Sequence, residues 1–257
     1  MNIHRSFSIS RARFLPVFIK EYKKFLVFMQ GQFNKDADNR FQKSEADFVQ
    51  WDIIQTEGEK FLQPITFQLY MKGREISSRS LNITTSFEVV DINAVEAANR
   101  ICSELVTNVT TETKKAINNY ISAGIEEGKS TYDISRELRS VVGLNSKQEA
   151  AVRNFRLFLQ DKYPTDIIDL KVAKYAKSKL IERTQAISRT EVARAQNVGY
   201  VEGLRNSGIL EVEFSANASA CEEQCQPLNG NIYSIEEGSK IIPVHPHCTC
   251  AMLPVTR

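Results

Sequence analysis

The chain has 257 residues, enough for one large domain or two small ones with a core that needs no disulfide or metal to hold it. With only 11 glycines and 7 prolines and with 42% hydrophobic residues, the composition indicates a helix-rich globular protein and excludes collagen-like, low-complexity and mostly disordered chains. The net charge of +2 is a small difference between 33 basic and 31 acidic side chains, so by itself it indicates no nucleic-acid partner.

The most apolar segment, residues 14–28, is interrupted by four charged side chains: Lys20, Glu21, Lys23 and Lys24. We therefore predict no transmembrane helix and no membrane partner. The apolar run 14–19 is too short for the core of a signal peptide, and no small-residue cleavage site follows it. We expect the chain to stay in the cytoplasm where it is made, with its thiols reduced.

Residues 1–30 predict an amphipathic helix with a basic flank. Its apolar residues recur at steps of three and four: Phe14, Phe18, Tyr22, Phe25 and Met29. We favour a helix that packs on the protein's own core; a docking arm for a larger assembly and a membrane-surface helix are the alternatives.

From Ile65 the pattern changes to alternation, with apolar residues at Ile65, Phe67, Leu69 and Met71, and Lys72-Gly73 follows as a turn. This pattern predicts a short pair of strands that ends near residue 90. Together with the N-terminal helix, these strands make residues 1–90 the first predicted segment and a candidate for docking to a portal or another partner.

Helical periodicity then defines a second segment, a helical domain over residues 91–208. Its predicted helices cover 92–124, 130–143, 146–162 and 169–207. Two pairs, Ser130 with Asp133 and Ser146 with Glu149, have the spacing of a helix-capping box.

The longest predicted helix is basic in its first half. Its candidate nucleic-acid contacts are Lys171, Lys174, Lys177 and Arg183. A solvated helix face is the simpler interpretation, because no aromatic side chains interleave to stack on bases. Further along, the small residues Ala193, Ala195, Gly199 and Gly203 predict a tight crossing with another helix.

The third segment, residues 209–257, reads as a compact, turn-rich module. Leu210, Val212 and Phe214 alternate with glutamates as a short strand, Asn229-Gly230 suggests a hairpin turn, and Ser234 with Glu237 has capping-box spacing. The predicted fold class is thus mainly α, a long-helix bundle with a small C-terminal α+β module of the zinc-knuckle kind.

This module holds a cluster of candidate metal ligands. They are Cys221, Cys225, His245, Cys248 and Cys250. Two close-spaced pairs of thiols on turns about twenty residues apart suit tetrahedral zinc, which takes two donors from each turn. We favour the four cysteines as ligands, with His245 as the main substitute for Cys248.

Three other interpretations of the cysteines remain open. They could form two disulfides in an extracellular particle, or stay as free buried thiols. A catalytic zinc is less favoured, because no His-x-Glu or His-Glu-x-x-His pattern supplies a general base. The fifth cysteine, Cys102, lies on an apolar helical stripe and is predicted to be a core residue.

Two groups of residues together resemble a known family. Ile187-Ser-Arg-Thr-Glu191 with Ala195, Asn197 and Gly199 resembles the "I-A-R-T-E … A-x-N-x-G" helix of the phage Mu F-like minor head proteins, also called phage head morphogenesis proteins. Downstream, Cys221-x-x-x-Cys225-x-x-Leu228-x-Gly230 and Pro243-x-His245-Pro246-x-Cys248-x-Cys250 resemble the closing signature of that family. The similarity covers about residues 87–254.

Three positions depart from the family pattern. Phe214 and Asn217-Ala-Ser219 stand where the family often has a tryptophan and an aspartate, the first cysteine pair is one residue wider, and Thr249 replaces an arginine. These changes put any polar role of that aspartate in doubt.

The resemblance implies a minor capsid protein of a tailed phage that is assembled in the host cytoplasm and lies inside the virion near the portal. Its implied partners are the portal protein, other head proteins and packaged DNA, and it implies no enzymatic reaction. The alternative is a zinc-dependent nucleic-acid-binding protein.

Overall fold

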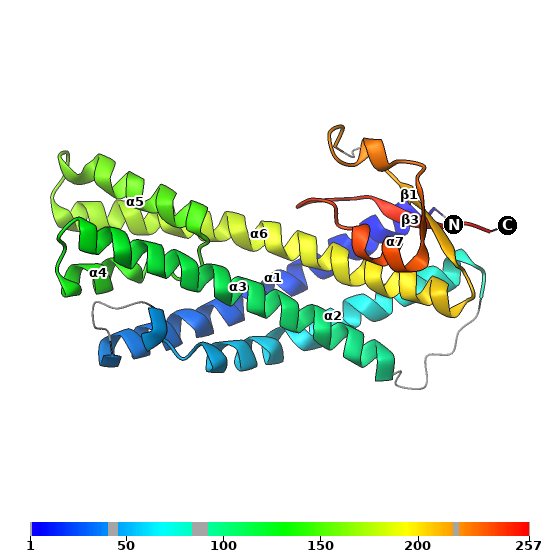
Figure 1. Ribbon diagram of the computed structural model, residues 1–257, viewed down its shortest axis with the longest axis horizontal. Coiled ribbons are helices and arrows are strands. Elements are labelled where there is room, and N and C mark those ends of the chain that lie inside the picture. Colours follow the sequence, from blue (N-terminus) through cyan, green and yellow to red (C-terminus); the bar gives the residue numbers. More distant parts are fainter. Residues whose placement is uncertain (1, 41–45, 84–91, 218–220, 257) are drawn as a thin grey trace. The chain divides into compact units, whose positions relative to one another are not determined.

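A computed structural model describes residues 2–40, 46–83, 92–217 and 221–256, and it is mainly α with a small antiparallel sheet near the C-terminus (Figure 1). The predicted fold class is confirmed. The α-helices are α1 Ile3–Arg40, α2 Trp51–Ser80, α3 Ile92–Glu126, α4 Thr131–Leu138, α5 Ser146–Gln160, α6 Thr165–Asn206 and α7 Ile235–Ile241. The strands are β1 Glu211–Ser215, β2 Ile232–Ser234 and β3 Ala251–Pro254, and two short 3-10 helices cover Ala46–Phe48 and Gln226–Leu228.

These elements form two compact units built from segments far apart in the sequence. The first unit comprises Met1–Glu21, Leu62–Cys102 and Gln185–Arg257, and the second comprises Tyr22–Phe61 and Ser103–Thr184. The division into segments 1–90, 91–208 and 209–257 stays a prediction. Across the described ranges, no helix is both long enough and apolar enough to cross a bilayer.

The predicted strand pair from Ile65 is wrong as far as Ser80, because these residues belong to helix α2. The buried apolar positions Leu62, Ile65, Leu69 and Ile76 are spaced by three, four and seven residues, which is a helical period. Phe67 and Met71 are only partly buried and lie beside this stripe, which produced the apparent alternation. The rest of the predicted pair, residues 84–90, lies outside the described residues.

Helices α2 and α6 cross in the first unit with their backbones almost in contact. A Cβ atom at Gly199 would overlap the carbonyl oxygen of Tyr70, and one at Gly73 would overlap that of Gln196. A Cβ at Gly203 would collide with the Ser77 hydroxyl in the same way. The predicted tight crossing is therefore confirmed, and Gly73 serves this crossing rather than a turn.

The C-terminal sheet has the order β2-β1-β3, and both pairings are antiparallel. Strand β1 confirms the predicted alternation at Val212 and Phe214, which are fully buried, whereas Leu210 lies before the strand and is exposed. Helix α7 begins with the predicted capping box between Ser234 and Glu237. Asn229-Gly230 forms a tight turn, in which the Asn231 N–H donates to the Leu228 carbonyl at 3.1 Å, but it lies within the longer connection between β1 and β2 and is not a two-residue hairpin loop.

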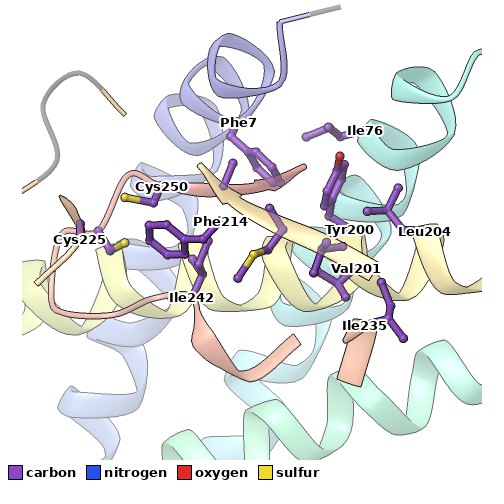
Figure 2. Close-up of a cluster of buried hydrophobic side chains, with 14 residues drawn as sticks. Phe7, Ile76, Tyr200, Val201, Leu204, Phe214, Cys225, Ile235, Ile242 and Cys250 are labelled. Atoms are coloured by element: carbon purple, nitrogen blue, oxygen red, sulfur yellow. The ribbon is translucent and has the colours of Figure 1, made fainter. Parts of the chain in front are cut away.

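The sheet shares one hydrophobic core with the helices of the first unit. Phe7 of α1, Ile76 of α2 and Tyr200 of α6 pack with Phe214 and Cys225 in the same cluster (Figure 2). The rings of Phe7 and Tyr200 meet edge to face with centroids 5.3 Å apart. The C-terminal module is therefore part of a larger core and is not an appendage.

The second unit confirms most of the predicted helix boundaries. Ser130 caps α4 and accepts a hydrogen bond from the backbone N–H of Asp133, as its spacing predicts. Helix α5 begins at Ser146 as predicted, but the predicted capping box of Ser146 with Glu149 is wrong, because Asn145 is the N-cap and forms the box with Gln148. A second hydrophobic cluster joins α5 and α6 through Val152, Leu159, Val172 and nearby side chains.

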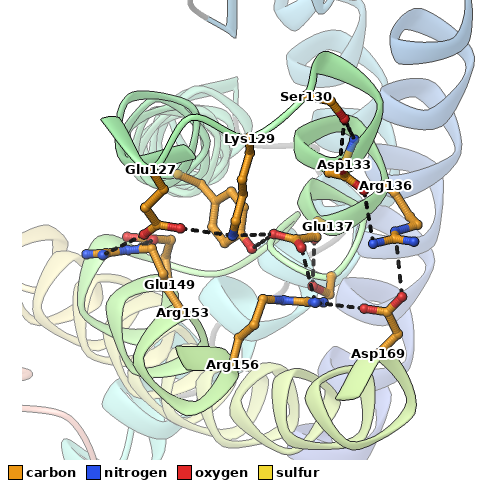
Figure 3. A network of polar contacts seen from close by, with 12 residues as sticks. Glu127, Lys129, Ser130, Asp133, Arg136, Glu137, Glu149, Arg153, Arg156 and Asp169 are labelled. Carbon is orange, nitrogen blue, oxygen red and sulfur yellow. Dashed lines mark hydrogen bonds and ion pairs between the residues drawn. The ribbon is translucent and has the colours of Figure 1, made fainter. Parts of the chain in front are cut away.

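The second unit also contains a buried network of ion pairs, centred on Glu137 of α4 (Figure 3). This carboxylate accepts hydrogen bonds from the Tyr120 hydroxyl at 2.6 Å and from Lys129 Nζ at 2.8 Å. It also pairs with Arg156 Nη1 at 3.1 Å, and Arg156 in turn contacts Asp169 at 2.7 Å. Glu137 is thus shared by two basic side chains that are largely withdrawn from water, and each of these has a second carboxylate partner, Glu127 at 3.0 Å for Lys129 and Asp169 for Arg156.

Replacing Glu137 with glutamine is expected to lower the free energy of unfolding by about 2 kcal/mol, because Arg156 and Lys129 lose their shared counter-charge inside the protein. The amide still accepts from Tyr120, so the loss is smaller than for an apolar replacement. Denaturant unfolding measures the change. The exposed pair Lys60–Glu57 is the control, since K60M should alter stability by less than about 0.5 kcal/mol. Equal effects of the two variants would contradict this role for the network.

Candidate metal site

The candidate ligands come from two turns that flank the C-terminal sheet. After β1, a turn places Cys221 and Cys225 together, with the Cys225 N–H donating to the Cys221 carbonyl at 3.2 Å. The second turn runs from His245 to Cys248, whose N–H donates to the His245 carbonyl at 3.1 Å. Cys250 lies directly before β3. Pairing of β1 with β3 explains how residues 20 or more positions apart converge.

The structure brings all five predicted ligands together. In one triplet, the donor atoms of Cys221, Cys225 and His245 lie within 4.8 Å of one another, and in the other those of Cys225, Cys248 and Cys250 do. The two triplets share Cys225, whose Sγ lies 3.1 Å from His245 Nε2. The cluster could hold a metal ion.

The thiols differ in burial. Cys225, Cys248 and Cys250 are buried, whereas Cys221 and His245 are half-buried. All five cysteines of the chain are free, and Cys102 is buried on α3 as predicted. The three buried sulfurs make the interior of the site, and the two remaining donors lie at its edge.

The ring of His245 is held in an orientation that suits coordination. Its Nδ1 lies 2.7 Å from the carbonyl oxygen of Pro246, and because a carbonyl only accepts, Nδ1 carries the hydrogen. In the neutral ring the lone pair is then on Nε2, the atom that faces Cys225. A hydrogen bond of this kind is the usual way in which proteins orient a metal-binding histidine.

The thiols do not ionise with equal ease. A hydrogen bond from the side chain of Cys250 lowers the pKa of Cys248, and the same interaction raises the pKa of Cys250. Burial raises the pKa of Cys225. A metal ion binds thiolates, so it would have to displace protons from Cys225 and Cys250, and its affinity should fall in acid.

Two residues of α1, which sequence reasoning missed, also belong to the site. Arg11 Nη1 donates to the carbonyl oxygen of Cys248 at 3.3 Å, and His4 Nε2 lies 2.9 Å from the Ser215 hydroxyl. Burial lowers the pKa of Arg11 to about 10, while negative charge on Cys248 and Cys250 acts to raise it. Arg11 is one of several basic residues on its helix, and nothing in the local pattern distinguishes it.

A pocket of about 290 Å³ adjoins the cluster on the side of Cys248. Its lining combines apolar and basic side chains: Arg11, Ala12, Leu15, Arg189, Val192, His247, Cys248 and Thr249. Arg189 Nη1 donates to His247 Nδ1 at 3.0 Å. The lining residues include no carboxylate, so the pocket supplies no Asp or Glu base beside the thiols.

The four candidate nucleic-acid residues do not form one surface. Lys171, Lys174 and Lys177 are exposed on α6, and Lys171 lies over the ring of Tyr163 at 4.6 Å. Arg183 is buried, and this part of the prediction is wrong. Its guanidinium donates to the Gly143 carbonyl and to Glu112, each at 2.6 Å, so it holds the second unit together.

The fold and the cluster define a mainly α protein whose C-terminal module could hold a metal ion. No protein-family model, no curated protein and no solved structure matches the chain.

Proposed function

We propose that the cluster binds one zinc ion and that the ion has a structural role. Thiolates and imidazole suit zinc far better than they suit magnesium or calcium, which prefer oxygen ligands. The three buried sulfurs, Cys225, Cys248 and Cys250, supply three ligands, and His245 or Cys221 supplies the fourth. His245 is the better fourth ligand, because its Nε2 is already free of hydrogen and faces Cys225.

In reducing buffer, the full chain is expected to purify with about one zinc ion, measured by inductively coupled plasma mass spectrometry. Removing the ion with a chelator should increase hydrogen exchange over residues 211–256, because metal binding contributes directly to the folding of such modules. The ion pairs of the second unit serve as the internal control, and exchange around Glu137 should stay unchanged. A metal-free protein with full protection in 211–256 would refute the structural zinc.

We further propose that the protein is a minor structural component of a tailed-phage head, placed inside the capsid near the portal. One observation carries this proposal: both segments that resemble the head morphogenesis proteins are used for structure. In the first segment, Gly199 permits the crossing of α2 and α6, and Asn197 is buried and bonded to the Ala193 carbonyl. In the second segment, the cysteines and His245 form the candidate zinc site.

A direct test uses particles of the phage whose genome encodes the chain. Quantitative mass spectrometry should find the protein in few copies per purified head, and cross-linking should join it to the portal protein. A chain that is absent from purified heads would refute the assignment to the capsid. It would do so without affecting the zinc proposal, which the purified protein tests separately.

The alternative function is a zinc-dependent nucleic-acid-binding protein, and the exposed lysines Lys171, Lys174 and Lys177 are the observation that favours it. The zinc module is poorly suited to contact phosphates, because residues 211–237 contain six glutamates and no lysine or arginine. Any contact with packaged DNA would therefore come from the basic N-terminal helix α1 or from α6.

A further inference from the structure

We infer that Arg11 of helix α1 is a positioning residue of the metal site, and that it supplies the positive charge that balances the thiolates. The inference rests on the proposed zinc site and adds to it a residue more than 200 positions away in the sequence. It makes the N-terminal helix part of the metal site, although that helix contributes no ligand.

The hydrogen bonds of Arg11 are the first line of support. Arg11 Nη1 donates to the Cys248 carbonyl, whereas Nε and Nη2 are buried and have no hydrogen-bond partner among the residues that the structure describes. A buried guanidinium with unmade hydrogen bonds is strongly unfavourable unless an anion lies beside it. The acidic side chains whose charge acts on Arg11 are those of Cys248 and Cys250. The charge of Arg11 is therefore best compensated when these thiols are thiolates, as they would be around a bound metal ion.

The charge of a zinc–thiolate centre is the second line of support. Zinc with three thiolates and an imidazole has a net charge of −1, and zinc with four thiolates has −2, since each thiolate contributes one negative charge. Either centre would be costly to bury without a compensating charge. The positive charge of Arg11 would neutralise the centre with three thiolates and would reduce the net charge of the four-thiolate centre from −2 to −1. Its bond to the Cys248 carbonyl also fixes the backbone between two ligands, which is how outer-shell groups orient a site.

The packing of α1 is the third line of support. On the same helix, Phe7 is 1% exposed in the core beneath the sheet, and His4 contacts Ser215 of β1. The cation of Arg11 also lies over the Phe7 ring, 5.0 Å from its centroid. These three side chains attach the first turns of α1 to both flanks of the site. Occupancy of the site by zinc should therefore protect the first turns of α1.

The test compares R11M and R11K with R13M in the full chain under reducing conditions. Arg13 is exposed on the same helix, so R13M removes an equal charge without touching the site. Zinc affinity is measured by competition with a chromophoric chelator, and R11M is expected to weaken it by about 10- to 100-fold, which is typical for loss of an outer-shell partner. R11K keeps the positive charge but lacks the planar guanidinium, so its zinc affinity should lie between those of R11M and the natural chain.

Two further readouts separate positioning from a general loss of structure. The charge-transfer absorption of the Co²⁺-loaded protein should keep its intensity in R11M, because the number of thiolate ligands is unchanged, while its energy shifts. Hydrogen exchange should show zinc-dependent protection of residues 3–15 in the natural chain and in R13M, and much less in R11M. If R11M does not fold, R11K carries the affinity test.

The inference is overturned if the Arg11 variants bind zinc as tightly as R13M. It is also overturned if zinc leaves exchange in residues 3–15 unchanged in the natural chain. A natural chain that binds no zinc would instead refute the proposed site itself, so the two failures are distinguishable.

Discussion

Replacing Cys225 with alanine is expected to abolish zinc binding at working concentrations, with an affinity loss of more than ~100-fold. Cys225 is the one donor common to both triplets, so its removal leaves only two neighbouring donors on either side. It is also fully buried, and no other side chain can take its place without a rearrangement of the core. Competition with a chromophoric chelator measures the loss on the full chain.

Two matched variants make this expectation specific. Cys221 belongs to one triplet and is half-buried, so C221A should weaken binding on the order of tenfold, because His245 remains as the fourth ligand. Cys102 lies on α3, and C102A should leave zinc affinity unchanged. If C225A bound zinc as tightly as C102A, the proposed ligand set would be wrong.

The loss of zinc in C225A should extend beyond the C-terminal turns. Cys225 packs in the same core as Phe7, Ile76 and Tyr200, which come from α1, α2 and α6 (Figure 2). We therefore expect C225A to unfold at a temperature several degrees below that of the zinc-loaded natural chain, because a protein that no longer binds its ligand loses the stability that binding contributes.

The features that sequence predicted well are those fixed by neighbouring residues. Ser130 caps its helix because its hydroxyl reaches the N–H of Asp133, and that geometry needs only four consecutive residues. The capping box of α7 follows the same rule. The thiol cluster was also predictable, since two close-spaced pairs are themselves local patterns and the sheet only has to bring them together.

The features that sequence missed depend on partners distant in the chain. Arg183 resembles its lysine neighbours in sequence, yet it is buried because Glu112 and the Gly143 carbonyl receive its guanidinium. Arg11 is likewise distinguished only by Cys248, 237 positions away. The wrong strand prediction at Ile65 has the same origin, because a helix buried over a wide arc can mimic a period of two over a few residues.

The second large effect is expected at the crossing of α2 and α6. G199A should lower the free energy of unfolding by at least about 3 kcal/mol, because the added methyl overlaps the Tyr70 carbonyl oxygen and the two backbones must move apart. The overlap is with main chain, so no side-chain rotation relieves it. In a chain of this size the change corresponds to a fall of roughly 10 °C in the unfolding midpoint, measurable by differential scanning calorimetry.

The control is G31A, at a helical glycine of α1 where an added Cβ meets nothing within 4 Å. That substitution should raise stability by about 0.5–1 kcal/mol, because alanine has the better helix propensity. If G199A lowers the free energy of unfolding while G31A raises it, the same glycine-to-alanine change has opposite effects at the two sites. This result would show that close packing requires the glycine in the Ile187–Gly199 motif. If G199A were as stable as G31A, the close backbone contact would be wrong, and the structural role that supports a head protein would lose its main argument.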